Sequence, residues 1–297
     1  MLKEEMNQLR DTLLTGIAPL AWGTTYVVTT ELLPAGHPLF ASLIRALPAG
    51  LIALALARQL PTGAWWWKSA VLGVLNIGAF FPLLFVAAYR LPGGVAATLG
   101  AAQPLIVAVL VVLILRQSLS WPLVGWGLVG MLGVGLIVLR SSAQLDTIGL
   151  IAGLAGTASM ALGVVLAKRW GKPSNVSAVG YAGWLLTAGG LFLLPIALLA
   201  EGPPANLDTP ALLGYAWLGI VGGLVAYTLW FRGIRLLPIG SVAVLGLLSP
   251  LAAAALGAIV LGQTFGAIQS IGFVLALAAI VGGQVASGRR SQLVAES

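Results

Sequence analysis

The sequence contains no cysteine, a single histidine and few charges, since only 8% of its 297 residues are Asp, Glu, Lys or Arg. The lack of cysteine excludes disulfide bonds and thiolate metal sites, and one histidine cannot form a histidine cluster. Soluble domains carry about 25% charged residues, so this chain has too few to cover a water-exposed surface. With 59% apolar residues and a mean hydropathy of +1.03, the composition predicts an integral membrane protein.

Stretches with at most one charge recur at the length that a membrane-spanning helix needs, which is about 20 residues. They predict ten spans, at 12–30, 38–57, 69–89, 91–115, 117–139, 147–167, 173–200, 209–231 and two within 236–288 that are joined near 262–266. We therefore expect an all-α integral membrane protein with polar tails at 1–11 and 288–297.

The basic residues between the expected spans fall mostly on one side of the membrane. If the N-terminus is cytoplasmic, twelve basic residues lie on that side: Lys3, Arg10, Arg58, Lys68, Arg116, Lys168, Arg169, Lys172, Arg232, Arg235, Arg289 and Arg290. The other side holds Arg90 and Arg140. Because cytoplasmic loops are enriched in Lys and Arg, this bias predicts that both termini are cytoplasmic. The net charge of +7 then reflects orientation, and we expect no nucleic-acid partner.

One segment of the chain occurs twice. Residues 91–104 align without a gap on residues 237–250, with the shared pattern L-P-x-G-x-x-A-x-L-G-x-x-x-P at an offset of 146. The first copy opens a helix that is expected to start outside and the second a helix that starts inside. We therefore expect two antiparallel five-helix repeats, at 12–140 and 147–287. Inverted repeats of this kind are typical of secondary transporters, whose substrate site lies between the halves.

The motifs within these repeats carry a resemblance to a known family. They are Ala21-Trp22-Gly23-Thr24-Thr25-Tyr26, Arg45-Ala46-Leu47-Pro48-Ala49 and the two L-P-x-G…P segments. The chain resembles the drug/metabolite transporter superfamily, with two EamA-type repeats, and is similar to the YddG-type bacterial amino acid exporters. The resemblance implies a multi-pass carrier of the bacterial inner membrane that moves amino acids by alternating access. Many relatives carry Lys where this chain has Thr30, and Glu where it has Gln117 and Gln263, so mechanisms that depend on those charges do not carry over.

Aromatic and polar side chains at membrane depth are the candidate substrate contacts. Ring faces attract an ammonium group and stack on apolar side chains, and an amide is costly in lipid unless it faces a partner or a cavity. The candidates are Trp22, Tyr26, Asn76, Phe80, Phe81, Gln103, Trp184, Tyr227, Trp230 and Ser249. At the 146-residue offset Phe81 pairs with Tyr227. The alternative for each ring is ordinary packing or lipid anchoring.

Arg45 and two prolines are the candidate structural or gating residues. Arg45 lies roughly 10 Å into its helix, where a charge costs about 2.5–3.5 kcal/mol on insertion scales, so it either tethers helices or binds a carboxylate. Pro104 and Pro250 each follow a glycine, Gly100 and Gly246, by four residues. Proline removes the hydrogen bond to that glycine's carbonyl. We expect both segments to bend during transport, the alternative being a permanent kink.

The remaining residue types argue against catalysis and ion coupling. All eight acids lie in the termini or near the expected outer face: Glu4, Glu5, Asp11, Glu31, Asp146, Glu201, Asp208 and Glu296. An enzyme or a proton relay would need carboxylates or histidines at depth. We therefore expect no cofactor, no metal and no enzymatic activity, but a facilitator that acts as a monomer in the bilayer on a small-molecule substrate. The alternatives are export of cationic drugs or other small metabolites, a channel and, from a different class, an integral-membrane enzyme.

Overall fold

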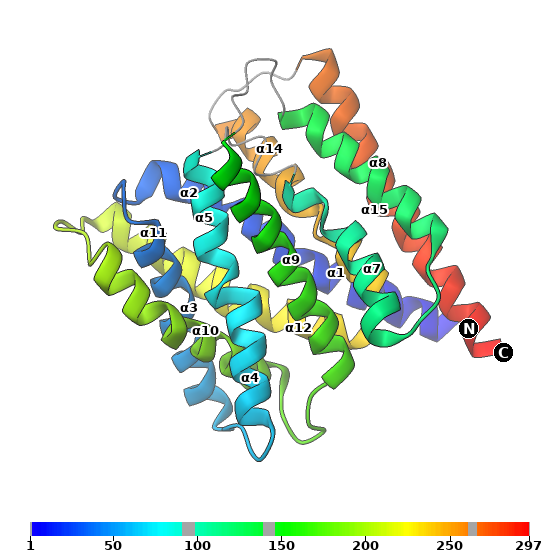
Figure 1. The fold of residues 1–297 in the computed structure, drawn as a ribbon, viewed down its shortest axis with the longest axis horizontal. Helices are drawn as coiled ribbons and strands as arrows, with labels where there is room; N and C mark the ends of the chain where they lie inside the picture. Colours follow the sequence, from blue (N-terminus) through cyan, green and yellow to red (C-terminus); the bar gives the residue numbers. More distant parts are fainter. Residues whose placement is uncertain (1, 91–98, 139–145, 261–265, 297) are drawn as a thin grey trace.

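The computed structural model describes residues 2–90, 99–138, 146–260 and 266–296, apart from the side chains of residues 2–5, 26, 30, 85, 88, 89, 138 and 289–296. Within these ranges every regular element is a helix (Figure 1). The first copy of the repeated segment lies mostly outside the described residues, as do the expected connection at 261–265 and Arg140.

The helices of the first half are α1 (Leu2–Gly23), α2 (Thr25–Leu32), α3 (Pro38–Ala57), α4 (Trp65–Gly73), η1 (Val74–Gly78), α5 (Phe80–Arg90), α7 (Gln103–Leu115) and α8 (Trp121–Val138). Those of the second half are α9 (Thr147–Trp170), α10 (Ala178–Ala200), α11 (Thr209–Gly219), η2 (Ile220–Val225), α12 (Ala226–Leu236), α13 (Ile239–Leu245), α14 (Leu248–Val260) and α15 (Ala267–Glu296). The segments η1 and η2 are π-helical turns.

Short polar side chains set where three helices of the second half begin. The side chains of Asp146, Ser177 and Asp208 accept hydrogen bonds from backbone N–H groups three residues later, at 2.7, 3.0 and 2.9 Å. These N-caps satisfy donors that the first helical turn leaves without a partner. Helices α3 and α7 end on Arg58 and Arg116, both in the left-handed region with φ of 50° and 54°.

Among the described residues, seven helical stretches are long and apolar enough to cross a membrane: 38–57, 65–84, 147–170, 178–200, 209–236, 239–260 and 267–288. Two shorter apolar helices, at 99–115 and 121–137, correspond to two further expected spans. The expected first span at 12–30 is divided at Thr24 into α1 and α2. The all-helical membrane fold is therefore observed, whereas the number of ten spans and the orientation of the termini stay predictions.

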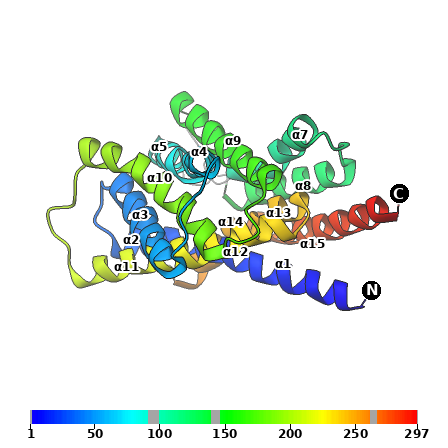
Figure 2. The same cartoon turned by 90° about the horizontal axis from the view of Figure 1, so that it is seen from below.

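The expected tails continue the neighbouring helices as far as the structure describes them, and their place on the cytoplasmic side stays a prediction. Helix α1 already begins at Leu2, and α15 continues to Glu296. Residues 2–11 contain neither proline nor glycine, so nothing in them breaks a helix that starts in polar sequence and continues into apolar sequence. Figures 1 and 2 place the N- and C-termini at the same end of the bundle.

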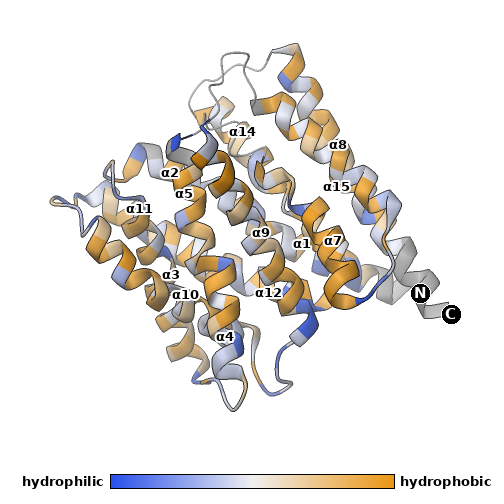
Figure 3. Cartoon of the chain, in the orientation of Figure 1, coloured by the Kyte–Doolittle hydropathy of each residue, from blue (hydrophilic) through white to orange (hydrophobic). Residues whose placement is uncertain are grey.

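Close helix packing depends on small residues. Helices α8 and α15 lie side by side (Figure 1), as do α3 and α10. A Cβ atom added to Gly133 would lie 2.6 Å from the backbone nitrogen of Ala276, and one added to Gly272 would lie 2.6 Å from the Gly133 carbonyl oxygen. The backbones of α8 and α15 therefore touch, as small-residue faces allow in membranes. Apolar residues colour the lengths of the helices in Figure 3, and hydrophilic ones gather at their ends.

Candidate functional site

The two π-helical turns occupy equivalent places in the two repeats. At the 146-residue offset, residues 74–78 of η1 fall on residues 220–224, which lie within η2. Each turn interrupts a helix between two α-helical parts, α4 and α5 in the first half, α11 and α12 in the second. Such turns are rare and are found mostly at functional sites. The repeat therefore extends from sequence to backbone geometry, and it places Gly222 at the position equivalent to Asn76.

The Gly222 carbonyl in η2 accepts hydrogen bonds from two residues of the first repeat. Arg45 donates through Nη2 at 3.2 Å and Trp22 through Nε1 at 3.0 Å. Arg45 also donates to Thr25 Oγ1 at 3.4 Å, and its guanidinium carbon lies 5.0 Å from the centre of the Phe81 ring. In this structure Arg45 is buried and connects α3 to η2 and to α2. The contact joins the first repeat to the π-helical turn η2 of the second repeat.

Five aromatic rings pack around this contact. Trp22 lies 5.0 Å from Tyr227 and 5.1 Å from Trp230, between ring centres. Tyr227 in turn lies 6.5 Å from Phe81 and 5.7 Å from Phe231. We call Trp22, Phe81, Tyr227, Trp230 and Phe231 the ring cluster. The structure thus brings together Phe81 and Tyr227, which the repeat pairs. Tyr227 is 1% and Trp230 0% exposed, so the ring cluster is closed in this conformation.

Other candidate contacts lie at its edges or away from it. Phe80 is half-buried and contacts Phe81, with 5.8 Å between ring centres. Asn76 is buried against Gly163 and donates to the Leu72 carbonyl of its own helix at 2.8 Å. Trp184 donates to the Gln59 carbonyl at 2.7 Å, beyond the end of α3. The side chain of Tyr26 lies outside the described residues. Asn76 and Trp184 are therefore engaged with the protein itself.

The two proline segments meet in space. A Cβ atom added to Gly246 would lie 3.3 Å from Gln103 Oε1. In the first proline segment the helix is interrupted at Ala102, directly after a helical turn at 99–101. In the second segment it is interrupted at Gly246 and Leu247, between α13 and α14. The Gly246 carbonyl, which Pro250 cannot bond, accepts from Ser249 N at 3.1 Å. In this conformation the Gly246 carbonyl therefore has a backbone partner, because the chain tightens after Gly246.

The described gating residues differ in their surroundings. A Cβ atom added to Gly100 would meet nothing within 4 Å, whereas Pro104 is buried. Ser249 and Pro250 are half-buried, and the Ser249 carbonyl lies 2.8 Å from where a Cβ of Gly23 would stand. Helix α14 therefore packs closely against the end of α1, next to Trp22.

A cavity of about 460 Å³ lies elsewhere, between α7, α8, α13, α15 and the end of α9. Of the candidate residues, Pro104 lines it, whereas none of the expected substrate contacts does. Sequence reasoning did not find this cavity, because it depends on the space left between helix faces. It also did not find the π-helical turns, for which the glycines at 73, 78, 222 and 223 were the available signal.

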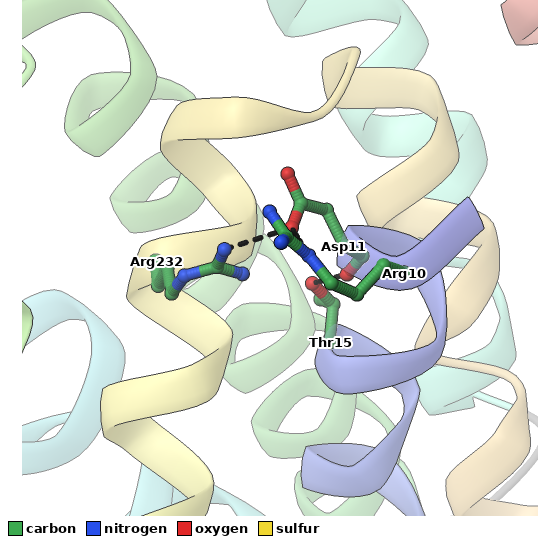
Figure 4. A network of polar contacts seen from close by, with 4 residues as sticks. All are labelled: Arg10, Asp11, Thr15 and Arg232. Atoms are coloured by element: carbon green, nitrogen blue, oxygen red, sulfur yellow. Dashed lines mark hydrogen bonds and ion pairs between the residues drawn. The ribbon is translucent and has the colours of Figure 1, made fainter. Parts of the chain in front are cut away.

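An ion pair joins the repeats at the end of the bundle where the termini lie. Arg232 Nη2 donates to Asp11 Oδ1 at 2.7 Å, from α12 to α1 (Figure 4). The Thr15 hydroxyl donates to the Asp11 carbonyl at 2.6 Å, and Thr15 packs directly on Gly233. Asp11 was expected in a polar tail, so its role in packing was missed. Among the described residues there is no group of three or more His, Asp or Glu side chains that could hold a metal ion.

Comparison with known proteins gives the family. The profile of the EamA-like transporter family matches residues 12–139 and 147–282. Protein PecM of Dickeya dadantii is 45% identical over 264 residues, which are 89% of each chain. The uncharacterized inner membrane transporter YedA of Escherichia coli K12 is 26% identical, over 88% of this chain and 86% of its own. The crystal structure of a protein that is 19% identical shares the fold with a TM-score of 0.79, over 95% of this chain and 99% of its own. The chain therefore belongs to the EamA-like transporter family and is a multi-pass membrane transporter of the drug/metabolite transporter superfamily.

Proposed function

We propose that the chain exports, or equilibrates, small neutral or aromatic amino acids and related metabolites across a bacterial inner membrane by alternating access. The observation that carries this proposal is the meeting of the ring cluster with Arg45 at the Gly222 carbonyl. The site combines residues of both repeats, which is where inverted-repeat transporters bind their substrates.

The site offers a suitable partner for each of the three parts of an amino acid, its ammonium group, its carboxylate and its side chain. The faces of Trp22 and Tyr227 attract an ammonium group, the guanidinium of Arg45 offers paired donors to a carboxylate, and the remaining rings stack on an apolar or aromatic side chain. Because the rings are closed here, binding requires a second conformation in which Trp22 moves away from Tyr227 and Trp230. Alternating access supplies such a second conformation.

Organic cations are the second candidate class of substrate. The ring cluster would attract them, but Arg45 places a positive charge 5.0 Å from the Phe81 ring, which repels a substrate that has no carboxylate. This charge favours the amino acid over the cationic drug. Proton relays through membranes use Asp, Glu or His side chains, and neither the ring cluster nor its Arg45 contact contains one, so we propose a facilitator whose flux follows the substrate gradient.

The test is counterflow in proteoliposomes with the full chain and a panel of phenylalanine, leucine, alanine and tetraphenylphosphonium. Trp22→Ala, Tyr227→Ala and Trp230→Ala should each reduce uptake of phenylalanine at least about fivefold, since loss of one aromatic contact and its packing removes more than about 1 kcal/mol. Trp66→Ala removes an exposed ring outside the ring cluster and should leave uptake unchanged. Wild-type uptake in all three cluster variants, or uptake of the cation alone, contradicts the proposal.

A further inference from the structure

The 460 Å³ cavity is an apolar groove with a polar mouth. Pro104, Val107, Val111 and Leu115 follow one another at helical spacing along one face of α7 and form one wall. Residues of α8, α13 and α15 form the opposite side, and Lys168 stands at the mouth with Gln117, Ser118 and Ser120. The groove therefore has an aliphatic body and a hydrophilic end, and it contains none of the residues of the ring cluster.

Two of the helices that border the groove turn their outer faces away from the protein. Helix α7 exposes Val109 and Leu113, and α8 exposes Leu128 and Leu132, with exposed fractions of 49–69%. In a membrane transporter such aliphatic faces contact lipid tails. The helices that border the groove therefore contact the hydrocarbon layer with their other faces.

The mouth of the groove is positively charged. A second hollow continues from it and is lined by Arg116, Lys168 and Arg169. Lys168 Nζ donates to the carbonyls of Arg235 and Leu237 at 3.0 and 2.7 Å, and Arg169 donates to the Ile114 carbonyl at 3.1 Å. Within the described ranges no carboxylate lies at ion-pair distance from these three cations. These carbonyls position Lys168 and Arg169, and no described side chain gives any of the three cations a carboxylate partner.

We propose that the groove binds an anionic phospholipid, with one acyl chain along α7 and the phosphate at Arg116, Lys168 and Arg169. Lys168 has a third ammonium proton beyond the two that its carbonyl partners accept, and each arginine carries five donors. The lining face of α7 from Pro104 to Leu115 is about 16 Å long at 1.5 Å per residue, which matches half of a hydrocarbon core of about 30 Å. Basic pockets between membrane helices recognise anionic headgroups in this way.

The experiment measures lipid adducts on the purified full chain in detergent by native mass spectrometry. Phosphatidylglycerol and phosphatidylcholine with identical acyl chains are added separately, because they differ in net charge. Phosphatidylglycerol should bind at least about fivefold more tightly than phosphatidylcholine. Arg116→Gln should weaken the binding of phosphatidylglycerol about fivefold, which is the effect of one cation near an anionic headgroup. Arg58→Gln is the matched control, because Arg58 also ends a helix in the left-handed region, on α3, and does not line the groove.

A second pair of variants tests the apolar body. Ala108→Phe fills the groove and should abolish adducts of both lipids, whereas Val109→Phe enlarges the neighbouring exposed side chain and should not. Glycerol 3-phosphate, which has the headgroup charge but no acyl chain, should not displace the lipid. The proposal is overturned if the two lipids bind equally, if Arg116→Gln behaves like Arg58→Gln, or if Ala108→Phe blocks transport while the adducts persist, which would assign the groove to the substrate path. The lipid-binding results do not depend on the ring cluster, because none of its residues lines the groove.

Discussion

Asp11 of α1 and Arg232 of α12 form an ion pair of 2.7 Å that connects the start of the first repeat to the second. Side-chain exposures of 13% and 23% leave the pair only partly screened by solvent. Because α1 and α12 also carry Trp22, Tyr227 and Trp230, the ion pair stabilises the same helix contact that closes the ring cluster. The ion pair therefore links α1 to α12 at the end of the bundle where the termini lie.

We expect a double-mutant cycle on Asp11→Asn and Arg232→Gln to give a coupling free energy of about 1 kcal/mol at pH 7, as for other ion pairs near a surface. Burial raises the pKa of Asp11, but the hydrogen bond and charge of Arg232, helped by Arg10, outweigh it and hold the pKa below its ordinary value. A lowered pKa means that the contribution is complete above the unfolded pKa, near 3.9, and is lost as the pH falls through the folded value. Thermal unfolding in detergent at pH 7, 5 and 3 measures it.

The same cycle built with Arg235→Gln in place of Arg232→Gln should show no coupling to Asp11, since no described ion pair joins Arg235 to a carboxylate. A coupling that disappears between pH 7 and pH 5 would contradict the assignment to an Asp11 of lowered pKa.

Gly133 provides a test of the contact between α8 and α15. Gly133→Val should lower the free energy of unfolding by about 1–3 kcal/mol, because the added side chain overlaps the backbone of Ala276 and the helices must move apart. Gly125→Val on the same helix is the control, since an added Cβ there meets nothing within 4 Å. Unfolding monitored by size-exclusion chromatography after heating measures both. Equal stability of the two variants would contradict direct backbone contact at Gly133.

Arg45 gives a test of how the substrate carboxylate is recognised. Under the proposed function, Arg45→Gln should reduce discrimination between phenylalanine and phenethylamine, which lacks the carboxylate, by about 10- to 100-fold, since a hydrogen bond to a charged group contributes about 1.5–3 kcal/mol. Competition of each compound against labelled phenylalanine in proteoliposomes measures this ratio. Arg90→Gln, at the end of α5 and paired with Asp146, is the control. If stability falls while discrimination stays, Arg45 acts as a tether between α3 and η2.

The sequence predicted those features of the fold that depend on short periodicities and on the repeat. The helical stretches follow from runs of apolar residues, and the pairing of Phe81 with Tyr227 follows from one constant offset. The π-helical turns were missed: the glycines beside them were a weak signal, because a single inserted residue in the hydrogen-bonding pattern changes the backbone without changing the composition. The groove between α7 and α13 was also beyond reach, because its volume depends on which helix faces fail to pack. The role of Asp11 in packing was missed, because a solvated tail also carries charged residues before an apolar run and the sequence does not distinguish the two.

The last prediction concerns the two proline segments, whose motion stays a proposal. The residues Gln103 and Gly246 are neighbours, so a change of bend in one segment must displace the other. Pro104→Ala restores a possible hydrogen bond to Gly100, and Pro250→Ala one to Gly246, and each should straighten its own helix. Because the repeats are expected to be antiparallel, straightening the first copy and straightening the second should favour opposite faces.

Each proline variant should therefore slow turnover at least about tenfold, if straightening the segment raises the free-energy barrier between the two states by about 1.4 kcal/mol. Cysteines introduced at Ser118 and at Ala35, exposed residues in connections at the two ends of the bundle, report accessibility to a membrane-impermeant thiol reagent, since the native chain has no cysteine. The two variants should shift labelling in opposite directions relative to the parent. Pro195→Ala, which removes a proline within α10, is the control and should leave both sites unchanged. Normal turnover with parental labelling in both variants would mean that the bends are permanent and only shape the packing.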